Sequence, residues 1–572
     1  MPRMRLVSSL TSLSLLLSFS ASAFAQNRPP VNPIQHIIIV VEENRSPDNL
    51  FGADTALIQA GANLWPAANN PGYTVSCLKT STNQEIQVHP IPIPLDTCVG
   101  PLHGHTDAWV PIFDNGANDG LCNVKPDLPK GCVFPGQYPQ YSYVPNTIQA
   151  NGSGLLDPYF QLANSYGFAN YMFQTNQGAS FAAHQFLFSG TSAPDYYNDP
   201  NGYTCGLIFP CWEWFVSDNP IASGDFTQST GCISNAPGEY VASIDPASDA
   251  PSAVYTPPLQ GAYPGYPCYD HPSMQDELAK GNVSWKYYSG SSAGLWNAPG
   301  SLYRVCQPSG IGGTCTWPGW NSTIIAPASR ADDQAQILND IESDPTCTQL
   351  ASVSWVMPDG RWSDHSAVAG DDGGPSWAAA LVNAIGNENP CHYWASTIII
   401  FTWDDWGGWY DHINPAEAMG GPGVGYKSAS SASAGAQYVY GFRVPLLVVS
   451  AYTPEGYISG GNTSGPSCPG PYCHDFGSIL SFVEHEFKLP LGGIGPKEFP
   501  YADYYAPDGP FTACGPVACP YPLADFFTLT KPRAFHPVIG AKYPETCFHY
   551  PNQKGCFTDK VFRPPDNDDD ED

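Results

Sequence analysis

Charged residues are scarce in this 572-residue sequence, and positively charged residues are the scarcest of them. Asp, Glu, Lys and Arg make up only 13% of the chain, and 22 Lys and Arg residues face 52 Asp and Glu residues, for a formal net charge of −30. A surface this acidic repels the phosphates of DNA and RNA, so nucleic acid is excluded as an expected partner. An anionic substrate needs a local positive centre, such as a bound metal ion.

Three further absences exclude other classes of protein. No apolar run beyond the N-terminal region approaches the length of a membrane span, so we expect no integral membrane span. No Cys-x-x-Cys pair occurs among the 18 cysteines, which disfavours a zinc cluster. No twin-arginine pair stands near the N-terminus, so ordinary secretory export is the expected route.

The N-terminal region has the pattern of a cleaved signal peptide. Arg3 and Arg5 precede an apolar, serine-rich run over residues 6–21, and the small residues Ala23 and Ala25 form a cleavage site. We therefore expect a signal peptide over residues 1–25 and a secreted or periplasmic protein. The cysteines fit that oxidising destination, and three close pairs are candidates for local disulfides: Cys468/Cys473, Cys514/Cys519 and Cys547/Cys556.

Buried strands alternate with helices along the chain. Four runs rich in β-branched residues are typical of parallel strands that are covered on both faces, and two segments between them have helical periodicity. This alternation predicts an α/β fold with a central, mostly parallel sheet flanked by helices. The predicted strands lie at 34–41, 351–356, 397–402 and 444–450, and the predicted helices at 376–385 and 476–487.

Two long segments lack this alternation. Residues 61–150 and 191–330 are rich in Pro, Gly, Tyr and Cys, and we interpret them as insertions pinned by disulfides that form a lid or a small subdomain. The sequence therefore predicts one large domain over residues 26–565, followed by an acidic tail at 566–572.

Oxygen-rich side chains follow the first and third predicted strands. Glu43 and Asn44 come shortly after the first strand, and Asp404 and Asp405 after the third. In open α/β sheets, ligands bind just beyond the carboxyl ends of the strands. Adjacent carboxylates there are costly unless a cation or a proton offsets their repulsion, and carboxylate and amide oxygens suit a hard or borderline cation. Solvated loop acids are the alternative for either segment alone.

A serine hydroxyl stands at a predicted turn into a helix. If residues 181–188 are helical, Ser180 lies at the N-cap, where backbone N–H groups can bind phosphate oxygens. His184 follows four residues later. A plain N-cap serine is the structural alternative. Ser180 does not lie in a Gly-x-Ser-x-Gly elbow, which disfavours an ordinary lipase or esterase triad.

Histidines near these segments could contact phosphate or protonate a leaving group, although a single histidine is more often structural. His412 follows the Asp-Asp turn, and a purely structural role, in which it holds that turn in place, is the alternative to a catalytic one. The full set of candidates is His103, His105, His271, His365 and His412.

Together these segments resemble the bacterial phosphoesterase family, which includes secreted acid phosphatases and phosphatidylcholine-type phospholipases C. The segments EENR at 42–45 and WDDWGGWYDH at 403–412 are specific in combination. The resemblance implies an alkaline-phosphatase-like α/β fold and a phosphoesterase domain over residues 26–565. Supporting segments appear in family order at 172–192, 359–367, 441–452 and 474–487.

The resemblance also implies a role for each matching residue. The implied metal ligands are Glu43, Asn44, Asp404, Asp405 and Ser180. The implied catalytic residues are Ser180, which is the nucleophile, with His105 and His365. The implied substrate-binding residues are Asn44, His105, His365 and His184. His103 is an alternative to His105, and His271 is a further candidate.

These roles predict a secreted, metal-dependent phosphoesterase that acts through a phosphoserine intermediate. Oxygen ligands favour Ca²⁺, Mg²⁺ or Mn²⁺, and a histidine ligand would favour Zn²⁺. The expected substrate is a small phosphate ester or a phospholipid. Ser180 followed by His184 is closer to the acid phosphatase branch, so we expect an acid phosphatase. The alternatives are a phospholipase C and, because aromatic residues bind sugars, a secreted glycan-binding protein.

Overall fold

The computed structural model describes most of residues 33–557, and one compact unit, residues 34–572, holds all of its helices and strands. The predicted signal peptide, the acidic tail and the Cys514/Cys519 pair lie outside the described residues. Within 33–557, the undescribed residues are 130–131, 134–135, 193–214, 217, 221–230, 235–242, 245–253, 256–266, 292–293, 311–312, 327–334, 367–371, 420–424, 427–437, 462–466, 469–471 and 490–521.

An eight-stranded sheet forms the centre of the fold, in the order β14-β13-β15-β1-β16-β19-β8-β20. Three of the predicted strands are the parallel neighbours β15 (Val353–Val356), β1 (His36–Glu42) and β16 (Thr397–Trp403). β1 and β16 pair over their whole length, up to Glu42 opposite Trp403, and both are buried throughout. Their carboxyl ends therefore meet at the same level of one sheet edge.

The fourth predicted strand is present, but its predicted direction was wrong. β19 (Leu446–Ser450) runs antiparallel to β16 and to β8 (Gly167–Ala169), while β20 (Tyr457–Ser459) is parallel to β8. The unbroken apolar run of β19 reflects its burial on both faces. Burial of this kind comes from covering helices and does not depend on strand direction.

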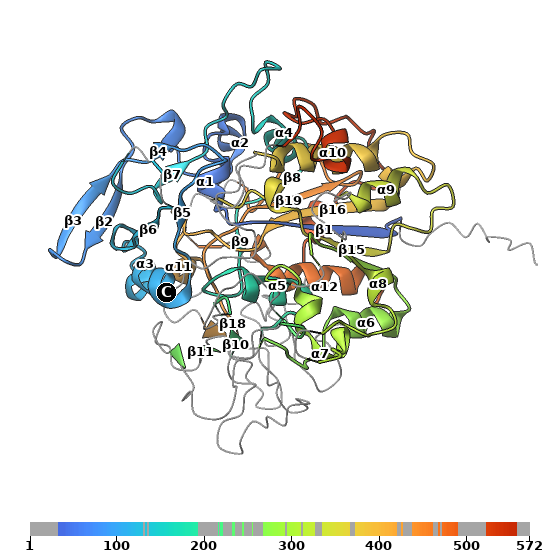
Figure 1. Cartoon of the computed structure of the whole chain (residues 1–572). Coiled ribbons are helices and arrows are strands. Elements are labelled where there is room, and N and C mark those ends of the chain that lie inside the picture. The colour runs from blue at the N-terminus through green and yellow to red at the C-terminus, as the bar shows by residue number, and fades with distance from the viewer. Residues whose placement is uncertain are drawn as a thin grey trace, which may run out of the picture. The chain divides into compact units, whose positions relative to one another are not determined.

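Helices cover both faces of the sheet (Figure 1). Over one face lie α4 (Asp157–Ser165), α9 (Gln336–Glu342) and α10 (Gly374–Gly386), and over the other lie α5 (Ser180–Ser189) and α12 (Phe476–Phe487). Both predicted helices are therefore confirmed, as α10 and α12. No described helix combines the length and apolar character that crossing a bilayer requires.

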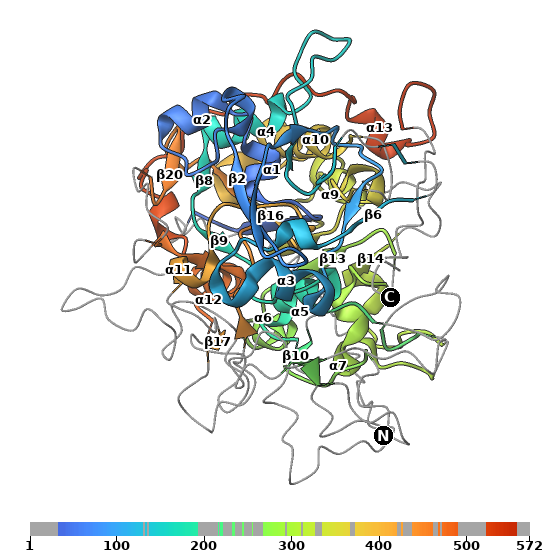
Figure 2. The ribbon, with the colours of Figure 1, turned by 90° about the vertical axis from the view of Figure 1, so that its left-hand side faces the viewer.

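Residues 61–150 form small sheets beside the central one. They contain the strand pairs β2 (Val75–Lys79) with β3 (Gln84–Val88), and β5 (Gly100–Pro101) with β6 (Pro126–Asp127). Figure 1 shows them to the left of the central strands, and Figure 2 shows them from that side. Two disulfides, Cys77–Cys122 and Cys98–Cys132, link this segment internally, as expected for a pinned insertion.

Part of the second predicted insertion belongs to the central sheet. Within 191–330, β13 (Trp285–Tyr288) and β14 (Ile324–Ile325) are parallel sheet strands, and α6 (Met274–Gly281) precedes them. The sequence analysis missed these strands because they are only four and two residues long. All cysteines of the described chain are in seven disulfides, which are typical of an extracytoplasmic protein. Cys468–Cys473 and Cys547–Cys556 confirm two of the predicted pairs.

Candidate active site

The ends of β1 and β16 bring four predicted ligands together. Glu43 and Asn44 follow β1, Asp404 and Asp405 follow β16, and all four side chains are buried. The Asn44 backbone N–H donates to Asp404 Oδ1 at 2.9 Å, and Asn44 adopts a left-handed backbone with φ of 60°. Asparagine tolerates this conformation better than most residues. The turn after β1 is thereby fastened to the turn after β16.

Ser180 meets this edge from the end of α5. Its Oγ lies 3.2 Å from Asp405 Oδ2 and 3.5 Å from Asn44 Oδ1, and the residue is buried. The prediction that Ser180 is the N-cap was wrong by one residue. The N-cap is Ala179, which has the extended backbone that this position requires, so Ser180 is the first helical residue. Its hydroxyl therefore points to the site instead of capping the helix.

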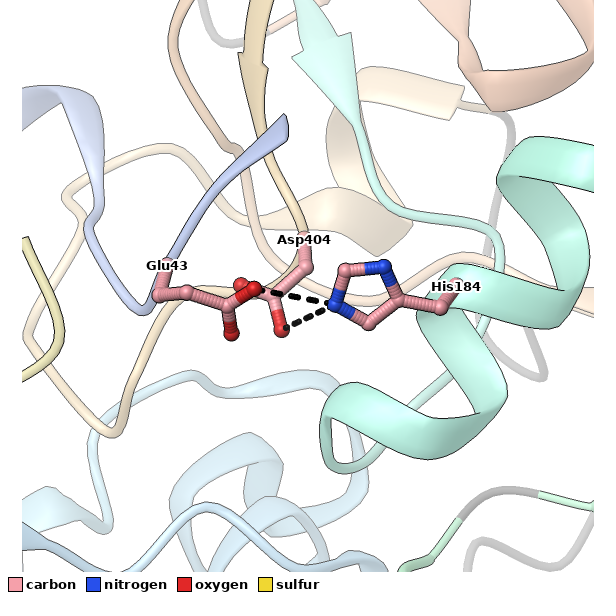
Figure 3. A group of neighbouring side chains, drawn as sticks. All are labelled: Glu43, His184 and Asp404. Atoms are coloured by element: carbon pink, nitrogen blue, oxygen red, sulfur yellow. Dashed lines mark hydrogen bonds and ion pairs between the residues drawn. The ribbon is translucent and has the colours of Figure 1, made fainter. Parts of the chain in front are cut away.

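His184, one turn further along α5, faces the carboxylates. Its Nε2 lies 2.9 Å from Glu43 Oε1 and 3.8 Å from Asp404 Oδ2 (Figure 3). The three residues offer one nitrogen and two oxygens, all within 4.8 Å of one another and all buried. Asp404 Oδ2 accepts no hydrogen bond from the residues that the structure describes. A buried carboxylate oxygen that accepts no hydrogen bond, beside a second carboxylate and an imidazole, can bind a divalent cation.

Two histidines approach the Asn44 side chain from different segments. Asn44 Nδ2 lies 3.2 Å from His103 Nε2 and 3.3 Å from His365 Nε2. His103 Nδ1 is 3.0 Å from Pro101 O, and His365 Nδ1 is 2.6 Å from Ser366 O. Because a carbonyl only accepts, this network assigns the hydrogen of each neutral ring to Nδ1. Each Nε2 is then the acceptor that faces the Asn44 amide.

Two further histidine candidates, His105 and His271, lie close to α5. His105 Nδ1 is 3.1 Å from Gln177 O, three residues before Ser180. The His271 ring stacks on Tyr269, which packs against Phe181 of α5. Burial lowers the pKa of His271 to about 4, so its imidazole is neutral at neutral pH. The structure therefore brings His103 and His365 onto Asn44, and His105 and His271 near α5.

A layer of buried residues supports the site, and sequence reasoning missed it. Arg45 donates from Nε and Nη2 to Asp364 O at 3.0 and 2.8 Å, which holds the backbone next to His365. Burial raises the pKa of Asp364 to about 6, and burial with the nearby Asp364 charge raises the pKa of Glu42. Tyr159 Oη donates to Asp364 Oδ2 at 2.8 Å. The only sequence signal of this layer was that Glu42 and Arg45 lie inside the segment EENR and Asp364 inside the supporting segment 359–367, and no such signal marked Tyr159.

The contacts of His412 support the structural role that was predicted as an alternative, in which it holds the turn after β16 in place. Its backbone N and its Nδ1 lie 2.7 and 2.6 Å from Asp48 Oδ2. The neighbouring Asp411 carboxylate accepts two hydrogen bonds from Arg443, at 2.8 and 2.9 Å. Asp48, Asp411 and His412 could also hold a metal ion by geometry alone. The Arg443 guanidinium already supplies the positive charge there, so we interpret this cluster as a brace for the turn after β16.

Comparisons with known proteins show what the chain is similar to. The model described as "Phosphoesterase family" matches residues 34–490. Phospholipase C A of Mycobacterium tuberculosis is 24% identical over 548 residues, covering 89% of this chain and 81% of its own. The hemolytic phospholipase C of Pseudomonas aeruginosa is 26% identical over 247 residues, covering 40% of this chain and 31% of its own. The solved lipoteichoic acid synthase LtaP of Listeria monocytogenes covers 62% of this chain and 70% of its own at 9% identity, with a TM-score of 0.26.

Proposed function

This chain belongs to the phosphoesterase family and hydrolyses phosphoric esters, and we propose that its substrates are phospholipids, which it cleaves as a phospholipase C. The observation that carries this proposal is the similarity to a phospholipase C over 89% of the chain. The spacing of Ser180 and His184 instead predicted an acid phosphatase. Ser180 and His184 belong to the chemistry at the phosphoryl group itself, which monoesters and diesters share. Their spacing therefore does not distinguish one substrate class from the other.

The proposed cation site consists of Glu43, Asp404 and His184, with Asp405 and Asn44 at its border. Its support is the mixed nitrogen and oxygen donors and the Asp404 Oδ2 atom, which accepts no hydrogen bond from the described residues. We assign His184 to this site and not to the substrate, because its Nε2 is directed at Glu43. A divalent cation held there would supply positive charge that attracts an anionic substrate and favours the alkoxide form of a nearby hydroxyl.

Ser180 is the proposed nucleophile. Its Oγ is within hydrogen-bonding distance of Asp405 Oδ2, which is the acceptor for its proton. A bond forms between Oγ and phosphorus while the bond from phosphorus to the glycerol oxygen breaks, which leaves the headgroup phosphate on Ser180. The diacylglycerol oxygen departs with a proton from Nε2 of an imidazolium, which becomes a neutral imidazole. Water then attacks phosphorus and gives a proton to the same imidazole. The bond from phosphorus to Ser180 Oγ breaks, phosphocholine leaves, and Oγ takes back the proton from Asp405.

The imidazoles of His103 and His365 are the proposed proton donors, and His105 remains a further candidate. The Nδ1 hydrogens of His103 and His365 are held by carbonyls, so Nε2 is the atom of each ring that exchanges a proton at the site. Asn44 contacts both rings through Nδ2 and Ser180 through Oδ1, so it holds the two Nε2 atoms close to the Ser180 hydroxyl. These contacts support a role for all three residues in holding the phosphoryl group.

A substrate panel tests the proposal. The metal-loaded enzyme is assayed on a soluble short-chain phosphatidylcholine, on bis-p-nitrophenyl phosphate and on p-nitrophenyl phosphate. We expect release of diacylglycerol and phosphocholine, with kcat/KM for the phospholipid well above that for the monoester. Preference for the monoester would favour the acid phosphatase alternative instead.

A further inference from the structure

A two-residue segment of the second insertion reaches the nucleophile's helix. Asp218 and Asn219 are both buried, at 8% and 3% exposure. The Asp218 carboxylate accepts a hydrogen bond from the backbone N–H of His105. The Asn219 side-chain oxygen accepts one from the backbone N–H of Phe181, at 2.9 Å. The segment thus joins the residue after Ser180 to the segment that carries His103 and His105.

The Asn219 contact fixes which way its amide faces. A backbone N–H only donates, so the atom opposite Phe181 must be the amide oxygen Oδ1, and Nδ2 is the amide atom left for another partner. Nδ2 is buried and donates to no acceptor among the residues that the structure describes. A buried donor without an acceptor is costly, and native proteins seldom keep one without a function.

The place of this donor indicates its acceptor. Phe181 is the second residue of the ten-residue helix α5, whose N-terminus carries the Ser180 hydroxyl. Helix N-termini attract the oxygens of phosphate groups, through their N–H groups and their positive end. The Asn219 amide is anchored on that helix end, and Nδ2 is its one free donor group within the described part of the chain.

We infer that Asn219 is a substrate-binding residue whose Nδ2 donates a hydrogen bond to a non-bridging oxygen of the phosphoryl group at Ser180. The inference rests on the proposed role of Ser180. It gives the second insertion a direct part in substrate binding, while Asp218 holds the neighbouring backbone of His105. The residue would stabilise substrate and transition state together, because the oxygen that it contacts stays on phosphorus throughout.

The alternative is that Asn219 only caps α5, and Asn219→Asp separates the two roles. A carboxylate still accepts from the Phe181 N–H, and an anion is favourable at a helix N-terminus, so a cap survives this change. A phosphate donor does not survive it, because an anion then faces the phosphoryl oxygens. The control for an added negative charge is Asn83→Asp, in the exposed turn between β2 and β3.

Two readouts are measured on metal-loaded protein: kcat/KM on a soluble phosphate ester, and the rise in Tm caused by inorganic phosphate. For Asn219→Asp we expect kcat/KM to fall about 10- to 100-fold and the phosphate-induced rise to vanish. Asn83→Asp should behave as wild type in both. Wild-type kcat/KM and phosphate response in Asn219→Asp would overturn the inference.

Asn219→Ala covers the case in which the aspartate variant does not fold beside Asp218. It removes donor and acceptor alike, so it should lower Tm in the absence of phosphate and weaken phosphate binding about tenfold or more. Wild-type phosphate binding in Asn219→Ala would overturn the inference, because only charge repulsion would then explain the aspartate result. Binding of inorganic phosphate does not depend on which ester the enzyme hydrolyses. The phosphate measurement therefore tests the role of Asn219, and the substrate panel tests the phospholipid proposal separately.

Discussion

Ser180 Oγ lies 3.2 Å from Asp405 Oδ2, although 225 residues separate the two along the chain. One atom comes from the start of α5 and the other from the turn after β16. The contact exists because the carboxyl edge of the sheet and the N-terminus of a covering helix meet at the same place. That meeting point is where α/β sheets bind their ligands, and the predictions below test what it does here.

Replacing the Ser180 hydroxyl should abolish turnover without disturbing the fold. Ser180→Ala removes the attacking oxygen, so we expect kcat to fall roughly 10³-fold or more with Tm within a few degrees of wild type. Ser189→Ala is the matched control, because Ser189 is buried at the far end of the same helix. Near-normal turnover by the Ser180 variant would remove the covalent mechanism.

Metal content should depend on His184. Exhaustive chelation is expected to abolish activity, and re-addition of the correct cation to restore it. His184→Gln removes the nitrogen donor, so Zn²⁺ affinity should fall roughly 100-fold or more. Loss of a residue that only hydrogen-bonds to a metal ligand already lowers affinity about 10- to 100-fold, and loss of the ligand itself should cost at least as much. The readout is metal bound per chain after dialysis against a graded metal buffer.

His412→Gln is the control for the metal prediction. His412 belongs to the other cluster of possible ligands, where Arg443 provides the positive charge. Its loss should leave the bound metal unchanged. Equal loss of metal in both variants would contradict the assignment of the cation to Glu43, Asp404 and His184.

The two histidines of the first insertion should differ in their effect on catalysis. Both rings have Nδ1 on a backbone carbonyl, but His103 Nε2 lies 3.2 Å from Asn44 Nδ2, whereas the His105 ring stacks on Trp109. We therefore expect His103→Gln to lower kcat/KM about 10²- to 10⁴-fold, as loss of an acid–base group does. His105→Gln should have the smaller effect. A larger fall in kcat/KM for His105→Gln than for His103→Gln would favour His105 as the catalytic histidine, as the family resemblance implied.

The arrangement of ligands at the strand ends was predictable from sequence, and strand direction was not. Runs of Ile and Val located β1 and β16, and in-register parallel strands must place Glu43 near Asp404. β19 has the same kind of apolar run but is antiparallel, because helices cover both of its faces whichever way it runs.

Contacts made by insertions were beyond sequence reasoning. Asn219 lies in a segment without periodicity, and only the folded chain shows that its side chain meets Phe181. The partnership of Asp364 with Arg45 was hidden for a different reason. It is a contact from side chain to backbone over 319 positions, and no residue pattern encodes such a contact. Side chains that contact a site from irregular loops depend on tertiary packing, which local patterns do not report.

Acid should destabilise the protein in part through His271. Burial lowers the pKa of His271 to about 4, so between pH 4 and pH 6.5 the unfolded chain binds a proton there that the folded chain does not. The free energy of unfolding therefore falls as pH drops through this window, by up to roughly 3 kcal/mol from this residue. Urea unfolding of wild type and His271→Gln at pH 7 and pH 4.5 isolates the contribution. If the difference in free energy of unfolding between wild type and His271→Gln is the same at both pH values, the predicted contribution of His271 is contradicted.

The account rests on Ser180 carrying the phosphoryl group, and trapping that intermediate tests it most directly. The metal-loaded enzyme is mixed with a short-chain phosphatidylcholine, quenched in acid during turnover, digested and examined by mass spectrometry. We predict that the peptide containing Ser180 gains the mass of the whole phosphocholine group, which a phospholipase C leaves on its nucleophile. Product formation with no adduct on that peptide, or with the adduct on another residue, would contradict the account.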